Sequence, residues 1–372
     1  MKLKKVEKYT DKIGKKLNLD KFIKNLLGMD SQQFSQTVLL WFKHFGRHDL
    51  PWQKDTTPYR VWVSEIMLQQ TQVVTVIPYF KRFMDRFPTL TTLALANIDE
   101  VLAHWSGLGY YARARNLHHT AQIIHKKYQG QFPTTVENLT LLPGIGQSTA
   151  GAILSLGMHR YAVILDGNVK RVLARYHALN IPINQSDGIN LLWDLAKKYT
   201  PRKDCWNYNQ AMMDIGAMIC TRTKPKCALC PLKKNCSANQ QARQTELPIK
   251  KPKINRPRKS IYLVLLQNTK GHILLEKRPS VGIWGGLWSF PECPIDENIE
   301  SWCRKKFNIG DTIKLERWNS FFHKFSHFEL EIKPILLQIS VRASQIMEGG
   351  FQIWYKKNSP AGRCCCTSST IT

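Results

Sequence analysis

The sequence predicts a two-domain protein in which an all-α domain precedes an α+β domain. Its 372 residues suit two domains at about 150 residues each. Apolar residues recur with a helical period from Ser31 onward, whereas the pattern beyond residue 260 is typical of β-strands. Hydrophobic residues make up 43% and charged residues 22% of the chain. This ordinary globular usage excludes disorder, collagen and coiled coil for the bulk of the protein.

Charge indicates the kind of partner. The 54 Lys and Arg residues exceed the 27 Asp and Glu residues by 27, a surplus that favours a polyanion, nucleic acid first and an anionic membrane second. No apolar run approaches the ~18 residues of a membrane span, and lysines interrupt the apolar residues near the N-terminus, so no signal-peptide core forms. We therefore expect a cytoplasmic, monomeric protein without membrane attachment.

The helical domain is predicted over 29–242. Residues 1–28 carry nine Lys against three acidic residues and form a basic N-terminal extension, interpreted as an unstructured tail, a DNA-binding arm or an artefact of a true start at Met29. Thr57 and Pro58 supply a cap and a first-turn proline for the helix that holds Glu65. Other helices are expected from Ser31 to Phe45 and at about 98–105, 112–127, 135–141, 147–157, 168–178, 187–198 and 206–219.

The second domain is predicted over 260–356, after a basic linker with three prolines over 243–259. An atypical tail follows over 357–372. The expected elements are strands at 261–267 and 272–277 around a turn, a helix at 296–307, and two strands within 320–339.

Four clustered cysteines indicate a metal centre. Cys220, Cys227, Cys230 and Cys236 are separated by six, two and five residues, and in a reducing compartment such clustering favours metal over disulfides. Four thiolates in one short loop suit an iron–sulfur cluster or a closed four-cysteine zinc site. Basic residues in the same loop suggest that the metal shapes a cationic surface.

The segment Leu142–Gly146, between two predicted helices, indicates a helix-hairpin-helix. Gly144 and Gly146 allow a tight hairpin whose backbone amides, at a helix N-terminus, can hold a phosphate without reading sequence. A plain turn is the alternative for so short a motif, but the flanking helices and the positive charge favour the hairpin.

Two carboxylates are candidates for catalysis. Glu65 lies on a helix dense in apolar groups, so partial desolvation should raise its pKa and keep it protonated, as a general acid requires. A surface glutamate is the alternative. Asp166 ends an apolar run and precedes a helix, so it is a helix N-cap, a residue facing a ligand cleft, or both.

These motifs together resemble the MutY family of bacterial adenine DNA glycosylases. The resemblance is collinear from about residue 29 to 353, and its segments are Leu50–Gln53, Ser64–Gln72, Gly107–Arg113, Leu165–Val169, the hairpin and the cysteine loop. It implies a helix-hairpin-helix glycosylase domain with a 4Fe–4S cluster rather than zinc. It also implies a reaction that removes adenine mispaired with 8-oxoguanine or guanine in double-stranded DNA.

The resemblance implies a role for each matched residue. Glu65 would protonate the flipped adenine, Asp166 would stabilise the developing oxocarbenium ion, and Asn168 would assist it. The chemistry agrees, because adenine leaves only once protonated and the remaining sugar is cationic, which takes one neutral and one ionised carboxyl. The adenine must be flipped out of the duplex, because its glycosidic bond is inaccessible in the base stack. The residues expected to contact DNA are Gln53, Gln70, Gly144, Gly146, Ser148 and Tyr110, the last as a wedge beside the oxidised guanine.

Ser148 predicts a monofunctional enzyme. Related glycosylases that also cut the strand have a lysine nucleophile at this position, and serine cannot form a Schiff base. Lys170 leaves room for a weak lyase side reaction.

The second domain resembles the MutT-like domain of the family, whose fold is shared with Nudix hydrolases. Gly286 and Glu292 fit the opening of a Nudix box. Magnesium-dependent hydrolysis is not expected, because the positions of the metal-binding residues hold Glu300, Ser301, Arg304 and Lys305. The loop that inspects the oxidised base is matched by Phe325, Ser326 and His327.

After Gly362 the chain departs from the family's pattern. Arg363 is followed by three adjacent cysteines, for which a frameshift or sequencing error is the leading explanation and a metal-binding tail the second.

Three other functions compete with the adenine glycosylase. Ser148 and the second domain disfavour an endonuclease III-like pyrimidine glycosylase, and the degraded box disfavours a Nudix pyrophosphatase. A non-catalytic DNA-binding protein would not need Glu65 and Asp166 together.

Overall fold

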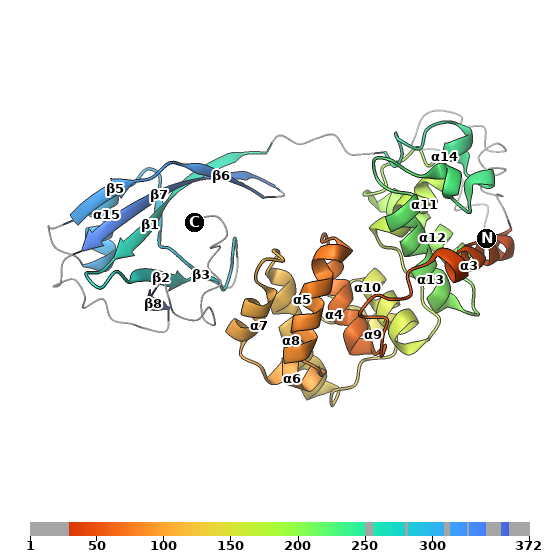
Figure 1. Ribbon diagram of the computed structural model, residues 1–372, viewed down its shortest axis with the longest axis horizontal. Coiled ribbons are helices and arrows are strands. Elements are labelled where there is room, and N and C mark those ends of the chain that lie inside the picture. The colour runs from red at the N-terminus through yellow and green to blue at the C-terminus, as the bar shows by residue number, and fades with distance from the viewer. Residues whose placement is uncertain are drawn as a thin grey trace. The chain divides into compact units, whose positions relative to one another are not determined.

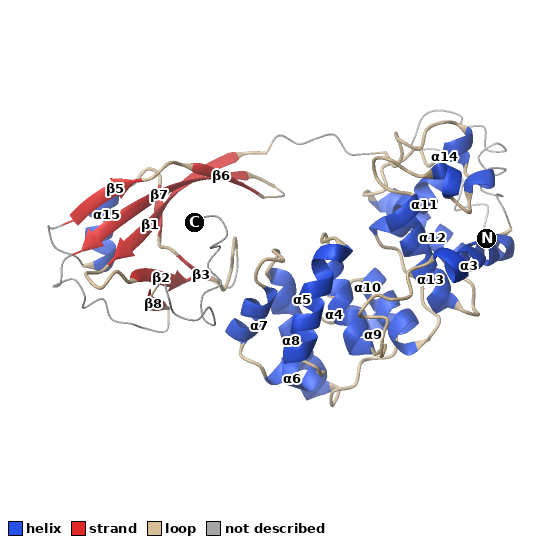
Figure 2. Ribbon diagram, in the orientation of Figure 1, coloured by secondary structure: helices blue, strands red, loops and turns tan. Residues whose placement is uncertain are grey.

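The computed structural model describes residues 30–249, 256–279, 282–308, 313–325, 327–339 and 351–356. Over these residues the chain forms two compact units, one from 30–91 with 120–249 and the other from 92–119 with the described residues from 256 onward. The predicted extension over 1–28 and the tail over 357–372 lie outside the described residues. Helices come first along the chain and strands follow from Arg258 (Figures 1 and 2), which confirms the predicted order of fold classes.

The helical part runs from Ser31 to Gln240. Its α-helices are α3 (Ser31–Phe45), α4 (Pro58–Leu68), α5 (Val73–Arg86), α6 (Leu90–Leu95), α7 (Ile98–Trp105), α8 (Ala112–Lys127), α9 (Val136–Thr140), α10 (Gln147–Ala152), α11 (Gly167–Tyr176), α12 (Ser186–Tyr199), α13 (Cys205–Asp214) and α14 (Ser237–Gln240). Two π-helical turns, η1 (Ile153–Gly157) and η2 (Ile215–Ile219), continue α10 and α13. No helix among the described residues is long and apolar enough to cross a membrane.

The predicted helices are confirmed within a few residues, and the bounds of α7 and α8 are as predicted. The Thr57 hydroxyl accepts a hydrogen bond from the Arg60 amide at 3.2 Å, so the predicted cap of α4 is present. The prediction omits α5, α6 and the four-residue α14. Pro78 lies inside α5 and resembles a helix breaker, whereas the six residues of α6 are too few for a periodic pattern.

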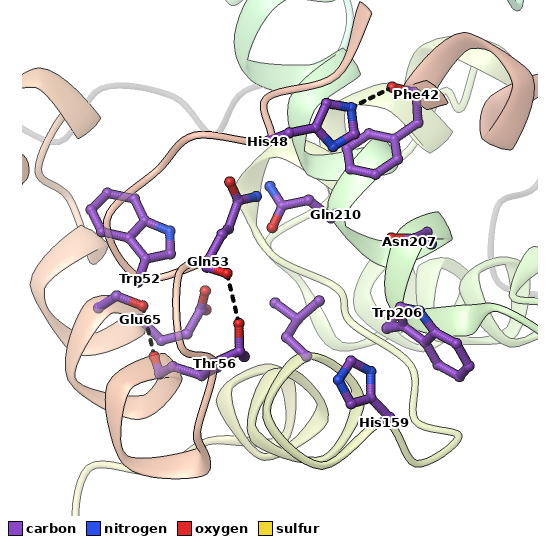
Figure 3. Close-up of a pocket in the computed structure, with 13 residues that line it drawn as sticks. Phe42, His48, Trp52, Gln53, Thr56, Glu65, His159, Trp206, Asn207 and Gln210 are labelled. Atoms are coloured by element: carbon purple, nitrogen blue, oxygen red, sulfur yellow. Dashed lines mark hydrogen bonds between the residues drawn. The ribbon is translucent and has the colours of Figure 1, made fainter. Parts of the chain in front are cut away.

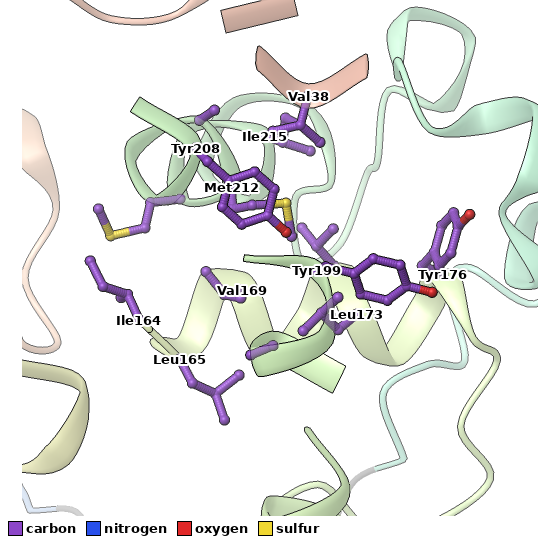
Figure 4. Packing of buried hydrophobic residues seen from close by; sticks show 14 of the residues in the cluster. Val38, Ile164, Leu165, Val169, Leu173, Tyr176, Tyr199, Tyr208, Met212 and Ile215 are labelled. Atoms are coloured by element: carbon purple, nitrogen blue, oxygen red, sulfur yellow. The ribbon is translucent and has the colours of Figure 1, made fainter. Parts of the chain in front are cut away.

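A hydrophobic core surrounds α11 in the first unit (Figure 4). Val169 and Leu173 of α11 lie among Val38 of α3, Tyr199 of α12 and Met212 of α13, and all five side chains are buried. Three of the clustered cysteines pack against the same core. This packing places the N-terminus of α11 and the base of the cysteine loop in one hydrophobic core.

The second unit contains a mixed sheet of eight strands within the described residues. Five strands follow the order β3-β2-β1-β7-β5, while β4 pairs with β1, β6 with β7 and β8 with β2. The long strands β1 and β7 are parallel, and the other pairs are antiparallel. The strands are β1 (Arg258–Gln267), β2 (Ile273–Lys277), β3 (Trp288–Ser289), β4 (Glu292–Pro294), β5 (Ile313–Arg317), β6 (Phe321–Lys324), β7 (Glu329–Ile339) and β8 (Gln352–Tyr355).

Both faces of this sheet carry buried residues. Val264 and Leu266 of β1 pack with helix α15 (Ile299–Phe307), whereas Leu263 packs with Phe328 in a separate cluster. The period of two along β1 therefore supplies two hydrophobic layers. The helix predicted at 296–307 is confirmed, although its first turn begins three residues later.

Two parts of the predicted linker belong to folded elements. β1 begins at Arg258, inside the range 243–259. At the other end, Leu247 is 1% exposed and packs against Ala178 and Ala238. Residues of the predicted linker therefore belong to each of the two units.

Candidate active site

Glu65 lines a cavity in the first compact unit. It lies on α4 between the buried residues Ser64 and Ile66, beside a cavity of about 220 Å³. Figure 3 shows Glu65 and Trp52 on one side of this cavity and a pair of rings, His159 and Trp206, on the other. A carboxyl group and several aromatic rings therefore line the same cavity.

The carboxyl group of Glu65 has a raised pKa. Burial raises the pKa of Glu65 to about 8, and the nearby charge of Asp166 adds to this rise. A neutral carboxylic acid at pH 7 can donate a proton, which is the property that a general acid needs.

Asp166 caps the N-terminus of α11 and is surrounded by donors. Its Oδ1 accepts from the backbone amides of Asn168 at 3.0 Å and Val169 at 2.8 Å, and its Oδ2 accepts from the Asn168 side chain at 2.9 Å. Burial raises the pKa of Asp166, while these hydrogen bonds favour its ionised form. Asp166 is therefore a helix N-cap and also an electrostatic neighbour of Glu65.

Arg171 orients Asn168. Its Nη2 donates to Asn168 Oδ1 at 2.9 Å and its Nε donates to the Cys220 carbonyl at 2.7 Å. The Asn168 amide nitrogen is thereby directed toward Asp166. A Cβ added at Gly216 would lie 2.5 Å from the Asn168 Cβ, so only glycine permits this approach of η2. The hydrogen bonds connect Asp166 to the start of the cysteine loop.

A polar group that the sequence did not reveal consists of the buried Gln210 and Asp214 and the half-buried Arg47. Gln210 lines the cavity, and its Nε2 donates to Asp214 Oδ1 at 2.9 Å. Asp214 is fully buried and also accepts from the backbone and the Nε of Arg47, at 2.8 and 2.9 Å. Because the amide nitrogen of Gln210 is engaged, its Oε1 remains available to a ligand in the cavity.

Gln53 lines the same cavity but uses its amide within its own loop. Its Oε1 accepts from the Leu50 amide at 3.1 Å, and its Nε2 donates to the Arg47 carbonyl at 3.0 Å. The side chain therefore shapes the wall of the cavity.

The predicted hairpin has the geometry of a tight turn. Gly144 has φ +79°, a left-handed value that favours glycine. Gly146 precedes α10, and an added Cβ there would meet nothing within 4 Å, so the surface at this glycine is open. The Ser148 hydroxyl accepts from the Leu165 amide at 3.2 Å and so supports the backbone that leads to Asp166.

Arg175 organises the cysteine loop. It is 2% exposed and donates to Cys220 Sγ at 3.3 Å, to the Thr221 carbonyl at 2.7 Å and to the Leu247 carbonyl at 2.9 Å. One guanidinium group thus joins α11, the loop and the beginning of the predicted linker.

The four loop cysteines fit a sulfur-ligated cluster. Burial raises the pKa of Cys230 to about 12, and the charges of Cys220, Cys227 and Cys236 add to the rise, so the four thiols are near neighbours. No group of three or more His, Cys, Asp or Glu side chains in the described ranges is arranged to hold a metal ion. Cysteine thiolates are the ligands of iron–sulfur clusters, and an N–H donor to sulfur, such as Arg175, tunes such clusters.

The remaining predicted residues lie on loops. Gln70 and Tyr110 are exposed and have left-handed φ values of 58° and 50°. His327 is exposed, whereas Phe325 is half-buried and stacks on Phe328 with ring centroids 4.7 Å apart. Ser326 lies outside the described residues.

Comparisons with known proteins agree with this organisation. The family model for the HhH-GPD superfamily of base excision DNA repair proteins matches residues 63–197, and the model for the NUDIX domain matches residues 262–363. The adenine DNA glycosylase of Buchnera aphidicola subsp. Baizongia pistaciae is 45% identical over 332 residues, which cover 89% of this chain and 93% of that protein. The chain belongs to the adenine DNA glycosylase family.

Adenine DNA glycosylases of other organisms are also similar. The rat protein is 34% identical, and the match covers 86% of this chain and 73% of the rat protein. The human protein is also 34% identical, and the match covers 80% of this chain and 65% of the human protein. The solved structure of a thermostable thymine-DNA glycosylase is 28% identical in sequence and aligns with a TM-score of 0.52. The alignment covers 57% of this chain and 97% of the thymine-DNA glycosylase. This adenine DNA glycosylase is therefore a base excision repair enzyme that hydrolyses N-glycosyl bonds. Its helix-hairpin-helix domain precedes a Nudix-like domain.

Proposed function

We propose that the enzyme removes adenine mispaired with 8-oxoguanine or guanine in double-stranded DNA, without cutting the strand. The observation that carries this proposal is the pair of unlike carboxyl groups. Glu65 has a pKa of about 8, while Asp166 accepts three hydrogen bonds that favour its ionised form. Glycosidic hydrolysis of a protonated base requires one acid and one anion.

The two carboxyl groups have different roles in the reaction. Glu65 donates its proton to the flipped adenine, which makes the base a better leaving group. The Asp166 carboxylate, held by Asn168, stabilises the positive charge that develops on the sugar. Water completes the hydrolysis because Ser148 offers no amine for a Schiff base. A general acid of this kind contributes roughly 10²- to 10⁴-fold to the rate.

Gln210 selects adenine at the amino edge of the base. Adenine presents an amino donor where guanine presents an oxygen acceptor. The Gln210 Oε1 is an acceptor because Asp214 binds the amide nitrogen. A base with oxygen at this edge would bring two acceptors together, at a cost of about 1–3 kcal/mol.

The cysteine loop holds a 4Fe–4S cluster through Cys220, Cys227, Cys230 and Cys236. When bound, the cluster fixes the shape of a cationic loop rather than the protonation of the substrate. The basic residues that this loop presents to DNA phosphates include Arg222, Lys224, Lys226, Lys233 and Lys234.

The Nudix-like domain reads the base opposite adenine. The exposed His327 follows Ser326, whose hydroxyl can both donate and accept. Phe325 supports this loop by packing on Phe328 and on Trp284, with ring centroids 4.7 and 5.4 Å apart. A cytoplasmic location and a monomeric state remain predictions.

One experiment tests the proposal against its competitors. Single-turnover excision is measured on duplexes with adenine opposite 8-oxoguanine, guanine or thymine, beside hydrolysis of 8-oxo-dGTP. We expect adenine release from the first two duplexes, an intact strand until alkali is added, and no nucleotide hydrolysis. Equal excision opposite thymine, or strand cleavage as fast as base release, would contradict the proposed specificity or the monofunctional mechanism.

A further inference from the structure

Two aromatic residues of the cavity have no part in the proposed proton transfer. His159 follows the π-helical turn η1, and Trp206 lies in the first turn of α13. Both line the cavity that contains Glu65, and Figure 3 shows them across that cavity from Trp52. Their ring centroids are 5.1 Å apart and their planes are 85° apart. Two distant segments of the chain therefore meet at this wall as one aromatic pair.

The local backbone holds the pair in place. His159 has φ +52°, which is uncommon for a residue with a Cβ and has an energetic cost. Before α13, Asp204 also has a left-handed φ of 58°, and its carboxylate accepts from the Asn207 side chain at 2.8 Å. Both segments thus adopt restricted conformations where they contribute a ring to the cavity.

The arrangement leaves a surface for a planar ligand. An edge-to-face contact uses one face of one ring, so His159 covers at most one face of the Trp206 indole. Trp206 is half-buried and His159 is exposed, which places the pair at the solvent side of the cavity. A flipped base is the planar group that this enzyme must admit.

We propose that Trp206 is a stacking platform for the extruded adenine and that His159 is the positioning residue that holds its indole. The proposal rests on the proposed function, because it takes a flipped adenosine as the ligand. Stacking of a base on an aromatic side chain contributes about 1–3 kcal/mol, which corresponds to roughly fivefold to a hundredfold in affinity.

The test compares two duplexes that differ only in the presence of the base. One contains 2′-fluoro-2′-deoxyadenosine, which resists hydrolysis, opposite 8-oxoguanine. The other contains a tetrahydrofuran abasic analogue at the same position. We expect Trp206→Ala to weaken binding to the first duplex about fivefold to a hundredfold and binding to the second less than twofold. Trp206→Phe, which keeps a ring, should recover most of the affinity.

His159 is tested through its dependence on Trp206. We expect His159→Ala to weaken binding to the adenosine duplex in the wild-type background but not in the Trp206→Ala background, because a positioning residue acts through its partner. Tyr161→Ala is the matched control: Tyr161 is two residues away, 37% exposed and stacked against Arg202 at 4.1 Å. This control should change both affinities in parallel or not at all.

The outcomes separate this proposal from the proposed function. If Trp206→Ala weakens both duplexes equally, Trp206 contacts the DNA backbone and the stacking proposal is wrong. An unchanged affinity for both duplexes overturns it as well. If instead the wild-type enzyme does not prefer the adenosine duplex and does not excise adenine, the proposed function itself fails.

Discussion

Glu65 and Asp166 carry the same functional group, but their surroundings differ. Burial raises the pKa of Glu65, whereas Asp166 accepts three hydrogen bonds at the N-terminus of α11. Local sequence predicted both surroundings, from the apolar residues around Glu65 and from the capping position of Asp166. The ion pair of Arg47 with Asp214 spans 167 residues, so no local pattern could reveal it. Gln210, which depends on that pair, was missed for the same reason.

Glu65→Gln should abolish adenine excision while binding to the mispair is retained. The amide keeps the shape of the side chain but has no proton to transfer, and loss of a general acid costs about 100-fold or more. Single-turnover excision and duplex affinity should be measured on the same preparation. A rate within tenfold of the wild-type enzyme would remove Glu65 from the role of acid.

Excision should decline as the pH rises through about 8. The acid must be protonated, and the raised pKa of Glu65, about 8, keeps it so at lower pH. At pH 9 the protonated fraction, and with it the rate, should be about tenfold lower than at pH 7. The measurement is single-turnover excision with saturating enzyme, which separates the chemical step from DNA binding. A rate that stays constant from pH 7 to 9 would show that Glu65 is not the titrating acid.

Among the elements, helices with a long apolar period were predictable and irregular turns were not. The bounds of α7 and α8 follow from their pattern. The π-helical turns η1 and η2 leave no periodic signal, although η1 precedes His159 and η2 contains Gly216. Such turns are frequent at functional sites. They depend on tertiary contacts, such as the approach of Gly216 to Asn168, which a local pattern does not contain.

Cys230→Ser should deplete iron and sulfide and weaken binding to DNA. The thiol is a proposed cluster ligand, and without the cluster the basic loop loses its shape. Metal analysis after anaerobic purification checks the first effect, and salt-dependent duplex affinity checks the second. Cys293→Ala is the control, because Cys293 is buried in the second unit and its loss should leave the iron content unchanged. Stoichiometric zinc without iron in the wild-type enzyme would contradict the cluster.

For the whole molecule, the order of fold classes could be predicted because the apolar period changes from helical to alternating within one chain. The ends of the linker could not, because its basic and Pro-rich composition does not show that Leu247 is buried against Ala178 and Ala238. The contact with Ala178 joins residues about 70 apart in the chain.

Removal of the second domain should preserve excision of adenine but reduce the preference for 8-oxoguanine over guanine as the opposite base. A chain that ends at Ile249 keeps Glu65, Asp166 and the cysteine loop but lacks His327. It should still excise adenine, while its preference for 8-oxoguanine over guanine falls roughly tenfold to a hundredfold. The ratio of excision rates on the two duplexes is the measurement. An unchanged ratio in a folded fragment would show that the second domain is not the reader.

The position of the cut provides a structural control. A chain that ends at Ala242 lacks Leu247, whose carbonyl accepts from the Nε of the buried Arg175. Loss of this partner leaves a buried donor unsatisfied, which costs about 1–3 kcal/mol. The shorter fragment should therefore unfold at a lower temperature than the fragment that ends at Ile249. Equal unfolding temperatures would show that Leu247 adds nothing to the helical unit.

The docked Leu247 also shortens the direct connection between the last helices of the first unit and strand β1. Nine residue steps join Ile249 to Arg258, and at ~3.5 Å per step they reach at most roughly 30 Å. For the proposed reader of the opposite base, a connection this short corresponds to an effective concentration of about millimolar. A reader domain with weak affinity of its own can then act efficiently, because it searches a small volume once the helical unit is on DNA. A change that released Leu247 would lengthen this connection and lower the effective concentration of the proposed reader, without altering a residue that is proposed to contact DNA.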